Sequence, residues 1–283
     1  MDIKFEKVSH LYKDYRKGVD AIKDIDLVIN AEDEFIAICG KTGSGKSTLV
    51  QHLNALLLPT SGNLFVLGQK LPPNKREKVN HLRQKIGLVF QFPEYQLFEN
   101  TVIKDIMFGP NNFKATKVNA KELAEKSAAL VGITSDLYER SPFQISGGQM
   151  RRVAIAGILA MNPKVLVLDE PTRGLDPKGR DEMMAIFKKI NEEEKKTIIM
   201  ITHDMDLVSK YAKRVIVLKD GKIAFDGQKE DLFELKDFDS FSLDLPRPLK
   251  ILKELSAKLN FPYIPKYSIE EVYEYLTEVF NVR

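Results

Sequence analysis

Apolar positions along the chain recur with the two spacings that distinguish strands from helices. Residues 3–8 alternate apolar and polar side chains, and residues 25–29 and 35–39 are rich in β-branched and other apolar types, so each predicts a strand. The runs at 165–168 and 198–201 are apolar throughout, which is typical of parallel strands covered on both faces. These segments predict the sheet of the fold.

Helical spacing fills the intervals between these strands. We expect helices at 47–57, 120–131, 148–161 and 181–193. Strands that alternate with helices predict an α/β fold with a mostly parallel core sheet. Because the first strands are joined by short loops rather than helices, we expect an antiparallel β subdomain beside the core. A largely helical stretch predicts a helical subdomain at about 100–160.

The pattern changes after Gly227. Two apolar stripes at helical spacing follow: Ile251, Leu252, Leu255 and Leu259, and then Ile269, Val272, Tyr273, Leu276, Val279 and Phe280. Prolines break the helices between them. We therefore predict a domain over 1–230 and a helical extension over 231–283. Glu270, Glu271, Glu274 and Glu278 make the second stripe too acidic for a membrane-surface helix, so we expect both stripes to pack on the domain or on a partner.

Composition and charge exclude several classes. The 43 Lys and Arg residues against 40 Asp and Glu leave a net charge of +3, which gives no argument for a nucleic-acid partner. The single cysteine, Cys39, cannot form an internal disulfide; it is either a small buried residue or a reactive thiol. No apolar run approaches the roughly 20 residues of a membrane-spanning helix, and the start lacks the apolar core of a signal peptide. We expect a cytosolic chain that reaches a membrane through a partner.

A phosphate-binding loop follows the strand at 35–39. Residues 40–47, GKTGSGKS, fit G-x-x-x-x-G-K-[ST] between a strand and a helix, so a chance match is the weaker interpretation. Glycines let consecutive N–H groups point at phosphate oxygens, Lys46 reaches the outer phosphates and the Ser47 hydroxyl holds Mg²⁺. The predicted nucleotide contacts here are Gly40, Lys41, Thr42, Gly43, Ser44, Gly45, Lys46, Ser47 and Thr48.

An acidic pair ends the apolar strand at 165–168. A carboxylate at such a position is costly unless it serves a metal or a charge. Asp169 is therefore expected near the magnesium ion, and Glu170 is the candidate that polarises the attacking water. The alternative is a helix N-cap followed by Pro171, but the P-loop in the same chain favours catalysis.

The segment ISGGQMRRVAIAG separates this chain from other P-loop proteins. Ser146, Gly147, Gly148 and Gln149 open a helix, whose N-terminus is a second anion-binding end. One molecule does not need two phosphate sites, whereas two head-to-tail molecules do, because each completes the site of the other. Here the sequence resembles the ATP-binding cassette (ABC) ATPases, with Ile145 in place of the usual leucine.

This resemblance covers about residues 2–230 and implies roles for further residues. Gln91 is similar to the Q-loop glutamine that contacts the metal, Asp176 to the D-loop aspartate, and His203 to the switch histidine that contacts the γ-phosphate. Tyr12 matches the aromatic residue that stacks on adenine, with Tyr15 as the alternative. The implied cofactors are ATP and Mg²⁺, with Ser47, Gln91 and Asp169 as metal contacts.

A narrower resemblance comes from VFQFPEYQLFENTV and the residues around ISGGQ. These are similar to the ATPase subunits of energy-coupling-factor transporters, which import vitamins and, in related forms, cobalt or nickel. Arg173 departs from the alanine usual in the family and would lie near the dimer seam. The residues after Gln91 are expected to expose Phe92, Tyr95, Leu97 and Phe98 around Glu94 as a contact for a membrane subunit.

The resemblance therefore implies a peripheral ATPase on the cytoplasmic face of the cell membrane. Its implied partners are a related ATPase or a second copy of the chain, a transmembrane coupling subunit and a substrate-binding membrane subunit. An ABC ATPase of another transporter class and a soluble cassette ATPase remain alternatives. A single-site P-loop kinase is a third, although it would leave SGGQ and His203 without a role.

Overall fold

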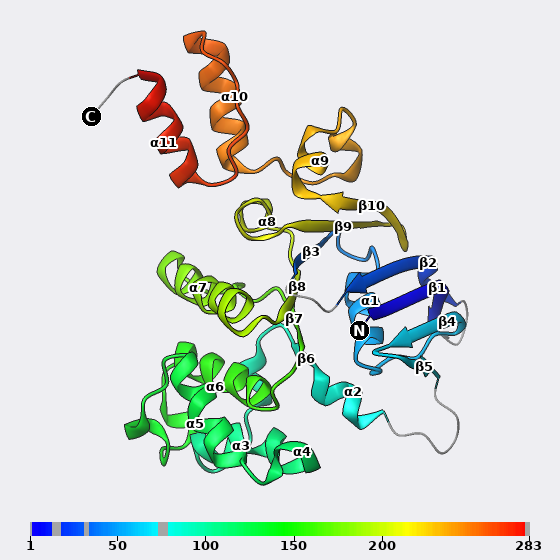
Figure 1. Ribbon diagram of the computed structural model, residues 1–283, viewed down its shortest axis with the longest axis vertical. Helices are drawn as coiled ribbons and strands as arrows, with labels where there is room; N and C mark the ends of the chain where they lie inside the picture. Colours follow the sequence, from blue (N-terminus) through cyan, green and yellow to red (C-terminus); the bar gives the residue numbers. More distant parts are fainter. Residues whose placement is uncertain (1, 13–17, 31–33, 73–78, 281–283) are drawn as a thin grey trace.

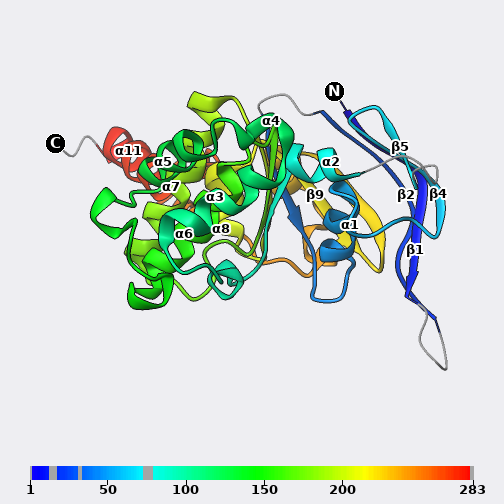
Figure 2. The same ribbon diagram turned by 90° about the horizontal axis from the view of Figure 1, so that it is seen from below.

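A computed structural model describes residues 2–12, 18–30, 34–72 and 79–280 of the chain (Figures 1 and 2). Tyr15 lies outside these residues. The strands are β1 (Asp2–Tyr12), β2 (Val19–Asn30), β3 (Phe35–Cys39), β4 (Ser61–Val66), β5 (Gln69–Leu71), β6 (Ile86–Val89), β7 (Val165–Asp169), β8 (Thr197–Ile201), β9 (Arg214–Lys219) and β10 (Lys222–Gln228). The helices are α1 (Lys46–Leu53), α2 (Asn80–Lys85), α3 (Val102–Asn112), α4 (Lys114–Lys117), α5 (Ala120–Leu130), α6 (Gly147–Leu159), α7 (Pro177–Glu194), α8 (Met205–Tyr211), α9 (Lys229–Glu234), α10 (Arg247–Leu259) and α11 (Ile269–Phe280). Single 3₁₀ turns occupy η1 (Pro93–Gln96), η2 (Ser135–Leu137), η3 (Pro142–Gln144) and η4 (Phe238–Phe241).

Two sheets form the framework. The core sheet has the order β10-β9-β3-β8-β7-β6, and only its β9–β10 pair is antiparallel. The second sheet, β2-β1-β4-β5, is antiparallel throughout. The predicted α/β fold, with a mostly parallel core and an N-terminal antiparallel subdomain, is confirmed.

The core strands are buried on both faces because their side chains alternate between two clusters. Val165 and Val167 of β7 pack with α1 and the antiparallel sheet. Leu166 and Leu168 pack instead with α3, α5, α6 and α7. In both views α1 lies on one side of the core sheet and α6 on the other (Figures 1 and 2). This separation matters for the site, because each of these helices begins at a predicted anion-binding motif.

The helical region α3–α6 lies beside the α7 face of the sheet (Figure 1). Its helices bury Val102, Ile106, Ala124, Ala128 and Val153 in one cluster with β7 and β8. The predicted helices differ from the observed ones mainly at their ends. The helix expected at 47–57 stops at Leu53, because Ala55 adopts a positive φ of 56° and the chain turns back there.

The C-terminal part divides into two packing units. Leu232 and Phe238 join the cluster formed by Ala37 and Cys39 of β3 with β9. Helices α10 and α11 instead pack on each other through Leu252, Phe261, Val272 and Tyr275, and form a separate lobe at the top of Figure 1. The division at 230/231 and the dimer-stabilising role of the extension stay predictions.

Both apolar stripes were expected to pack on the domain or on a partner; within the chain they pack mainly on each other, and their contact with a partner stays a prediction. The two helices bury their facing sides in each other, since an amphipathic helix pair can shield its own seam. Ile251, Leu259, Ile269, Tyr273 and Phe280 remain exposed. None of the helices in the described ranges combines the length and apolar character needed to cross a bilayer.

Candidate active site

A pocket of about 660 Å³ lies where β3, β7 and β8 end. Residues that follow three different strands line it: Gly40 and Lys46 from the P-loop, Glu170 and Arg173 after β7, and His203 after β8. The adjacent parallel strands β3, β8 and β7 carry these segments at the same edge of the sheet. Their convergence follows from the strand order rather than from closeness in sequence.

The P-loop backbone has the shape that its glycines allow. Gly40, Gly43 and Gly45 all have positive φ, at 141°, 82° and 103°. A Cβ atom on Gly40 or Gly45 would meet a backbone carbonyl at 2.2 or 2.3 Å, whereas one on Gly43 would meet nothing within 4 Å. The loop is therefore packed from behind and open in front of Gly43. An open concave backbone of this kind suits an anion.

The Lys46 side chain folds back and bonds to the start of the P-loop. Its Nζ donates to the carbonyl oxygens of Gly40 and Lys41, both at 2.8 Å. Burial lowers the pKa of the ammonium group, and the Glu170 and Asp169 carboxylates oppose that shift. Both bonds go to neutral carbonyls, which a phosphate can replace with a stronger charge-assisted bond.

The remaining P-loop side chains surround the start of α1. Lys41 and Thr42 line the pocket, while Ser44 and Thr48 are buried. The Ser44 hydroxyl oxygen has no hydrogen-bond partner among the described residues. The Ser47 hydroxyl lies beside the Asp169 carboxylate and lowers the pKa of that carboxyl.

Asp169 is the last residue of β7 and is half-buried. Burial raises the pKa of its carboxyl, Glu170 adds to that rise, and Lys46 and the Ser47 hydroxyl lower it. A hydroxyl and a carboxylate side by side are oxygen donors of the type that Mg²⁺ prefers. Within the described ranges, His, Cys, Asp and Glu form no cluster of three or more that could hold a metal by themselves. The donor set therefore fits a magnesium ion whose other ligands come from phosphates and water.

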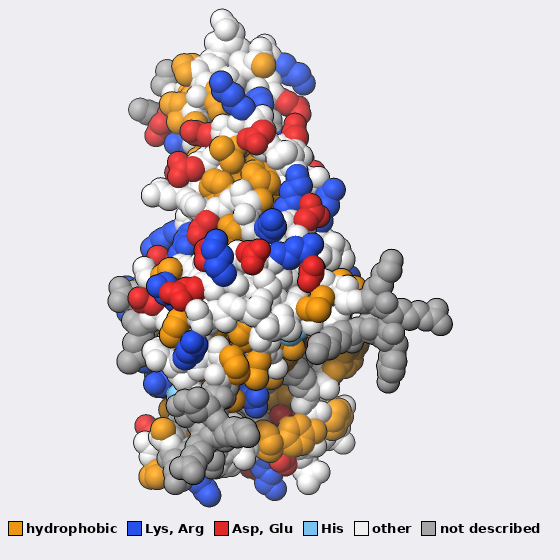
Figure 3. Space-filling view, turned by 90° about the vertical axis from the view of Figure 1, so that its right-hand side faces the viewer, with side chains coloured by type: hydrophobic (Ala, Val, Ile, Leu, Met, Phe, Trp, Pro, Cys, Tyr) orange, Lys and Arg blue, Asp and Glu red, His pale blue; other side chains and the backbone are white. Residues whose placement is uncertain are grey.

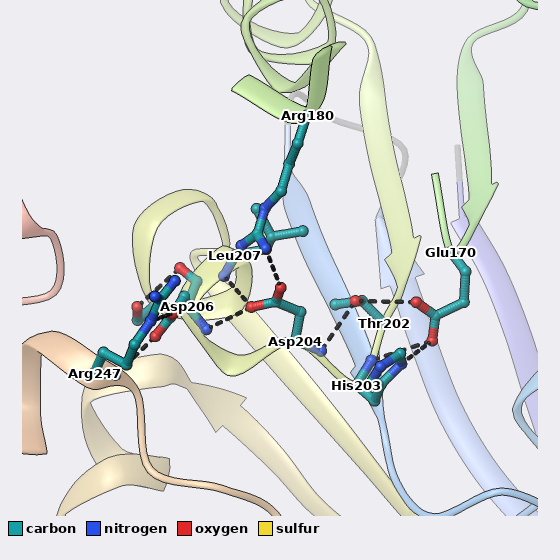
Figure 4. A network of polar contacts seen from close by, with 9 residues as sticks. Glu170, Arg180, Thr202, His203, Asp204, Asp206, Leu207 and Arg247 are labelled. Carbon is teal, nitrogen blue, oxygen red and sulfur yellow. Dashed lines mark hydrogen bonds and ion pairs between the residues drawn. The ribbon is translucent and has the colours of Figure 1, made fainter. Parts of the chain in front are cut away.

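Glu170 and His203 are in direct contact (Figure 4). His203 Nδ1 lies 2.7 Å from Glu170 Oε1, and the His203 backbone N–H donates to the same oxygen at 3.2 Å. Thr202 Oγ1 donates to the other carboxylate oxygen at 3.4 Å. Glu170 adopts a positive φ of 48°, an uncommon conformation for a non-glycine residue. The pair is thus held at the pocket with a defined side-chain direction.

A second polar chain continues from this pair into α8 (Figure 4). Asp204 caps α8 through the backbone N–H groups of Asp206 and Leu207, and Arg180 of α7 pairs with Asp204 at 2.8 Å. Asp206 in turn pairs with Arg247 of α10. The residues after His203 are therefore attached to both α7 and the C-terminal lobe. Sequence reasoning missed Arg180, which lies one turn after the start of α7 and carried no motif signal.

Gln91 follows β6 and contacts Arg173. The Gln91 carboxamide faces the Arg173 guanidinium, which can only donate, so the amide oxygen is assigned as the acceptor from Nε at 3.0 Å and from Nη1 at 2.7 Å. This places the Q-loop candidate beside the pocket through an arginine that lines it.

The signature residues lie apart from this pocket. Ser146 caps α6, accepting a hydrogen bond from Gln149 N–H at 3.2 Å, while the Gln149 carboxamide accepts one from Ser146 N–H at 2.9 Å. A Cβ atom on Gly147 or Gly148 would meet nothing within 4 Å, so the start of α6 is open. Residues 146–149, all of them described, are absent from the pocket lining. The structure therefore does not bring the two predicted anion sites together within one chain.

Three other predicted residues have clear structural environments. Tyr12 ends β1, is 43% exposed, and its hydroxyl lies 3.3 Å from Thr48 Oγ1 just beyond the P-loop. Asp176 caps α7 by accepting from Gly179 N–H at 3.1 Å. Cys39 is fully buried, and burial raises the pKa of its thiol to about 12. Of the two interpretations of Cys39, the small buried side chain is confirmed.

The expected exposure around Glu94 is wrong in part. Tyr95 and Phe98 are exposed as expected, but Phe92 is half-buried and Leu97 is buried. The Glu94 carboxylate accepts two hydrogen bonds, both at 3.0 Å, from Nε and Nη2 of Arg151. Arg151 comes from α6 in the signature region, so the carboxylate serves an internal pair rather than a free surface. The cause is the close packing of η1 against α6, which periodicity in either segment alone does not reveal.

Comparisons with known proteins agree with this geometry. A family model described as ABC transporter matches residues 22–173. The energy-coupling factor transporter ATP-binding protein EcfA2 of a Bacillus cereus strain is 46% identical over 99% of this chain and 97% of its own length. The protein of the same name from Streptococcus agalactiae serotype Ia is 48% identical over 94% of this chain and 95% of its own.

Solved structures show the same fold. CbiO1 of Clostridium perfringens, described as part of the ABC transporter complex CbiONQ, has a TM-score of 0.73 and 34% identity over 91% of this chain and 95% of its own. A dimeric ATP-binding cassette in a post-hydrolysis state, bound to ADP and Pi, has a TM-score of 0.69 and 31% identity over 80% of this chain and 98% of its own.

Proposed function

The chain belongs to the ABC transporter family, among the ATP-binding proteins of energy-coupling factor transporters, and from this premise we propose how its residues bind and hydrolyse ATP. It is the ATPase subunit of an importer of this type. Relatives that carry that name are 45–48% identical to this chain over nearly their whole length. We propose that it powers the uptake of vitamins or transition-metal ions through separate membrane subunits.

The nucleotide phosphates would lie in front of Gly43, where the loop is open. Backbone N–H groups of residues 40–48 and the first turn of α1 supply the donors. Lys46 would exchange its bonds to the Gly40 and Lys41 carbonyls for phosphate oxygens. Tyr12, exposed beside Thr48 in the first turn of α1, would present its ring to the adenine.

Ser47, Asp169 and Gln91 would hold the magnesium ion. Mg²⁺ supplies charge neutralisation for the phosphate oxygens when bound. The Ser47 hydroxyl and the Asp169 carboxylate are already adjacent. Asp169 is ionised most readily with a cation beside it, because burial otherwise favours its neutral form.

Glu170 and His203 would carry the hydrolytic step, and their contact at the pocket is the observation that carries the proposal. The Glu170 carboxylate would accept a proton from the attacking water. His203 Nδ1–H would orient that carboxylate, which leaves Nε2 to interact with the γ-phosphate. The left-handed backbone of Glu170 and the bond from Thr202 hold the carboxylate in place.

The open start of α6 would complete the site of a neighbouring molecule. Because α1 and α6 lie on opposite faces of the core sheet, Ser146, Gly147, Gly148 and Gln149 reach a phosphate only in trans. The related dimeric cassette supports this arrangement. The partner would be a related ATPase or a second copy of this chain, with Asp176 near the seam and the exposed side of α10–α11 adding contact.

A separate groove fits a membrane partner. Its volume is about 510 Å³, and Phe98, Phe108 and Met161 line it. Tyr95 and Phe98 are 85% and 56% exposed beside it. We propose that a short cytosolic helix of a transmembrane coupling subunit docks there, which places the chain at the cytoplasmic face of the cell membrane, with a substrate-binding membrane subunit in the same complex.

We propose no nucleic-acid partner. On the face shown in Figure 3, Lys and Arg side chains are interspersed with Asp and Glu. That mixture agrees with the small net charge of +3 and favours a protein partner over a polyanion.

Substitution of Glu170 by Gln tests the proposed chemistry. The variant keeps the shape of the side chain but removes the base, so hydrolysis of ATP should fall by about a hundredfold or more while binding of ATP persists. A stable ATP-bound dimer should then appear by size-exclusion chromatography. Glu192→Gln, an exposed change in α7, is the control and should behave as wild type. Near-normal hydrolysis by Glu170→Gln would contradict the assignment.

A further inference from the structure

Arg173 occupies an unusual place between the Q-loop and the pocket. Its guanidinium gives two hydrogen bonds to the Gln91 carboxamide oxygen, at 3.0 and 2.7 Å, and lines the same pocket as Lys46 and Glu170. The oxygen rather than the nitrogen of the amide faces Arg173, since a guanidinium can only donate. Because the guanidinium is charged, both of its bonds to the neutral carboxamide are charge-assisted.

The backbone of Arg173 is hydrogen-bonded on both sides, so the Cα position from which its side chain extends is fixed. Its N–H donates to the Glu170 carbonyl at 3.1 Å. Its own carbonyl accepts from Arg151 Nη1 at 2.9 Å, and Arg151 is 4% exposed and paired with Glu94. Arg173 therefore connects the segment after Glu170 to the signature helix through its backbone, and to the Q-loop through its side chain.

The two bonds occupy the acceptor capacity of Gln91. A carboxamide oxygen has two lone pairs, and Arg173 Nε and Nη1 take one each. A metal ion could coordinate this oxygen only after at least one of those bonds is broken. Resting on the function proposed above, we propose that Arg173 is a positioning residue that competes with Mg²⁺ for the Gln91 oxygen and so sets the magnesium requirement of nucleotide binding.

Release of Gln91 follows from the charges around the pocket. Lys46 and Arg180 line it together with Arg173, beside the carboxylates of Glu170 and Asp204, so bound phosphates lie close to cationic side chains. A phosphate oxygen is a stronger acceptor for a guanidinium than a neutral amide. Nucleotide binding thus draws Arg173 from Gln91 and frees the oxygen.

A magnesium titration of nucleotide binding tests this competition without measuring hydrolysis. Affinity for a fluorescent ATP analogue is measured at a series of Mg²⁺ concentrations and in EDTA, for wild type, Arg173→Ala and Arg173→Lys. Arg173→Ala should lower the half-saturating Mg²⁺ concentration roughly threefold to tenfold, the range for an exposed charge-assisted contact. Arg173→Lys keeps the charge but cannot give the same forked pair of bonds, so its shift should be intermediate.

A double-variant cycle makes the test specific to Gln91. In a Gln91→Ala background, Arg173→Ala should no longer change the Mg²⁺ dependence, because the contested oxygen is gone. Lys178→Ala is the charge control; its side chain is 85% exposed on α7, outside the pocket lining, and it should change nothing. Thermal unfolding of each variant confirms that it is folded, and Arg173→Lys carries the test if Arg173→Ala does not fold.

Three results would overturn the inference. An unchanged Mg²⁺ dependence in both Arg173 variants would show that the contact does not matter. Equal weakening of analogue binding with Mg²⁺ and in EDTA, together with an unchanged half-saturating Mg²⁺ concentration, would show that Arg173 acts only as a phosphate ligand. Persistence of the shift in Gln91→Ala would place the effect elsewhere. Failure of the wild-type chain to bind the analogue at all would contradict the proposed function itself, and is distinguishable from each of these.

Discussion

Replacing Glu94 by Gln should destabilise the fold rather than a docking surface. Glu94 and Arg151 form a forked pair whose side chains are 15% and 5% exposed. The substitution leaves the shape in place but removes the negative charge, so the buried guanidinium loses its counter-ion. Breaking one partner of a buried pair costs about 3–5 kcal/mol. Because Glu94 retains some contact with water, we expect the free energy of unfolding to fall by about 2–4 kcal/mol.

Urea unfolding followed by circular dichroism measures this change. The unfolding midpoint should shift with little change in slope, since the variant alters stability rather than the surface exposed on unfolding. Glu192→Gln removes the same charge from an exposed pair with Lys188, whose side chains are 60% and 56% exposed, and should cost less than about 0.5 kcal/mol. Arg151→Met in the Glu94→Gln background should recover part of the loss, because no unpaired buried charge remains.

Equal stability of Glu94→Gln and Glu192→Gln would refute this reasoning. Glu94 would then be free to meet a partner, as the sequence alone suggested. If the reasoning holds, substitutions at Glu94 cannot report on assembly, because they also disturb the packing of η1 on α6. Tyr95→Ala is the better probe of docking, since its side chain is 85% exposed and its loss leaves the pair intact.

Four further outcomes follow from the described contacts. Lys46→Ala should weaken ATP binding at least tenfold in a binding titration, since it removes the charge that pairs with phosphate; unchanged affinity would exclude that role. Ser146→Arg in one subunit of a mixed dimer should block nucleotide trapping in the P-loop of the other, and a defect confined to its own P-loop would exclude the head-to-tail arrangement. Burial lowers the pKa of His52 from 6.5 to about 4, so the stability contributed by its neutral ring is present above pH 6.5 and is lost as pH falls toward 4. Between these pH values the free energy of unfolding of wild type should fall by about 2–3 kcal/mol more than that of His52→Gln. Parallel pH profiles of the two proteins would contradict this. Because burial raises the pKa of Cys39 to about 12, iodoacetamide at pH 8 should modify it only in urea, and modification of the native chain by mass spectrometry would show access that the structure does not have.

Much of the fold was predictable because its signals are local. The runs at 165–168 and 198–201 became β7 and β8 within one residue at each end, since a strand buried on both faces has no polar interruption. The P-loop could also be predicted from the sequence, because its glycines must adopt conformations that other residues avoid. Spacing alone also predicted α10 and α11, although not that they would bury their seam in each other.

The parts that escaped prediction depend on contacts between distant segments. Arg151 lies 57 residues from Glu94, and neither carries a periodic signal that names the other. Arg173 was noted only as a departure from alanine, while its bonds to Gln91 require β6 and β7 to be neighbours in the sheet. Strand order determines the Gln91–Arg173 pair and the packing of η1 on α6 determines the Glu94–Arg151 pair, and no local pattern in the sequence predicts either.

The P-loop and the signature residues at the start of α6 lie on opposite sides of the core sheet. This arrangement makes the rate of hydrolysis depend on the concentration of the chain. A lone chain cannot fold α6 round to its own α1, because the sheet stands between them. On the proposed mechanism, only dimers hydrolyse ATP. At low concentration the total rate of hydrolysis therefore rises with the square of the chain concentration, and a monomer binds ATP without hydrolysing it. Dilution of the purified protein should therefore lower the turnover per chain, and a constant value across the dissociation range would show that one chain suffices. Because one sheet separates the two sites, ATP consumption would be confined to assembled ATPase dimers.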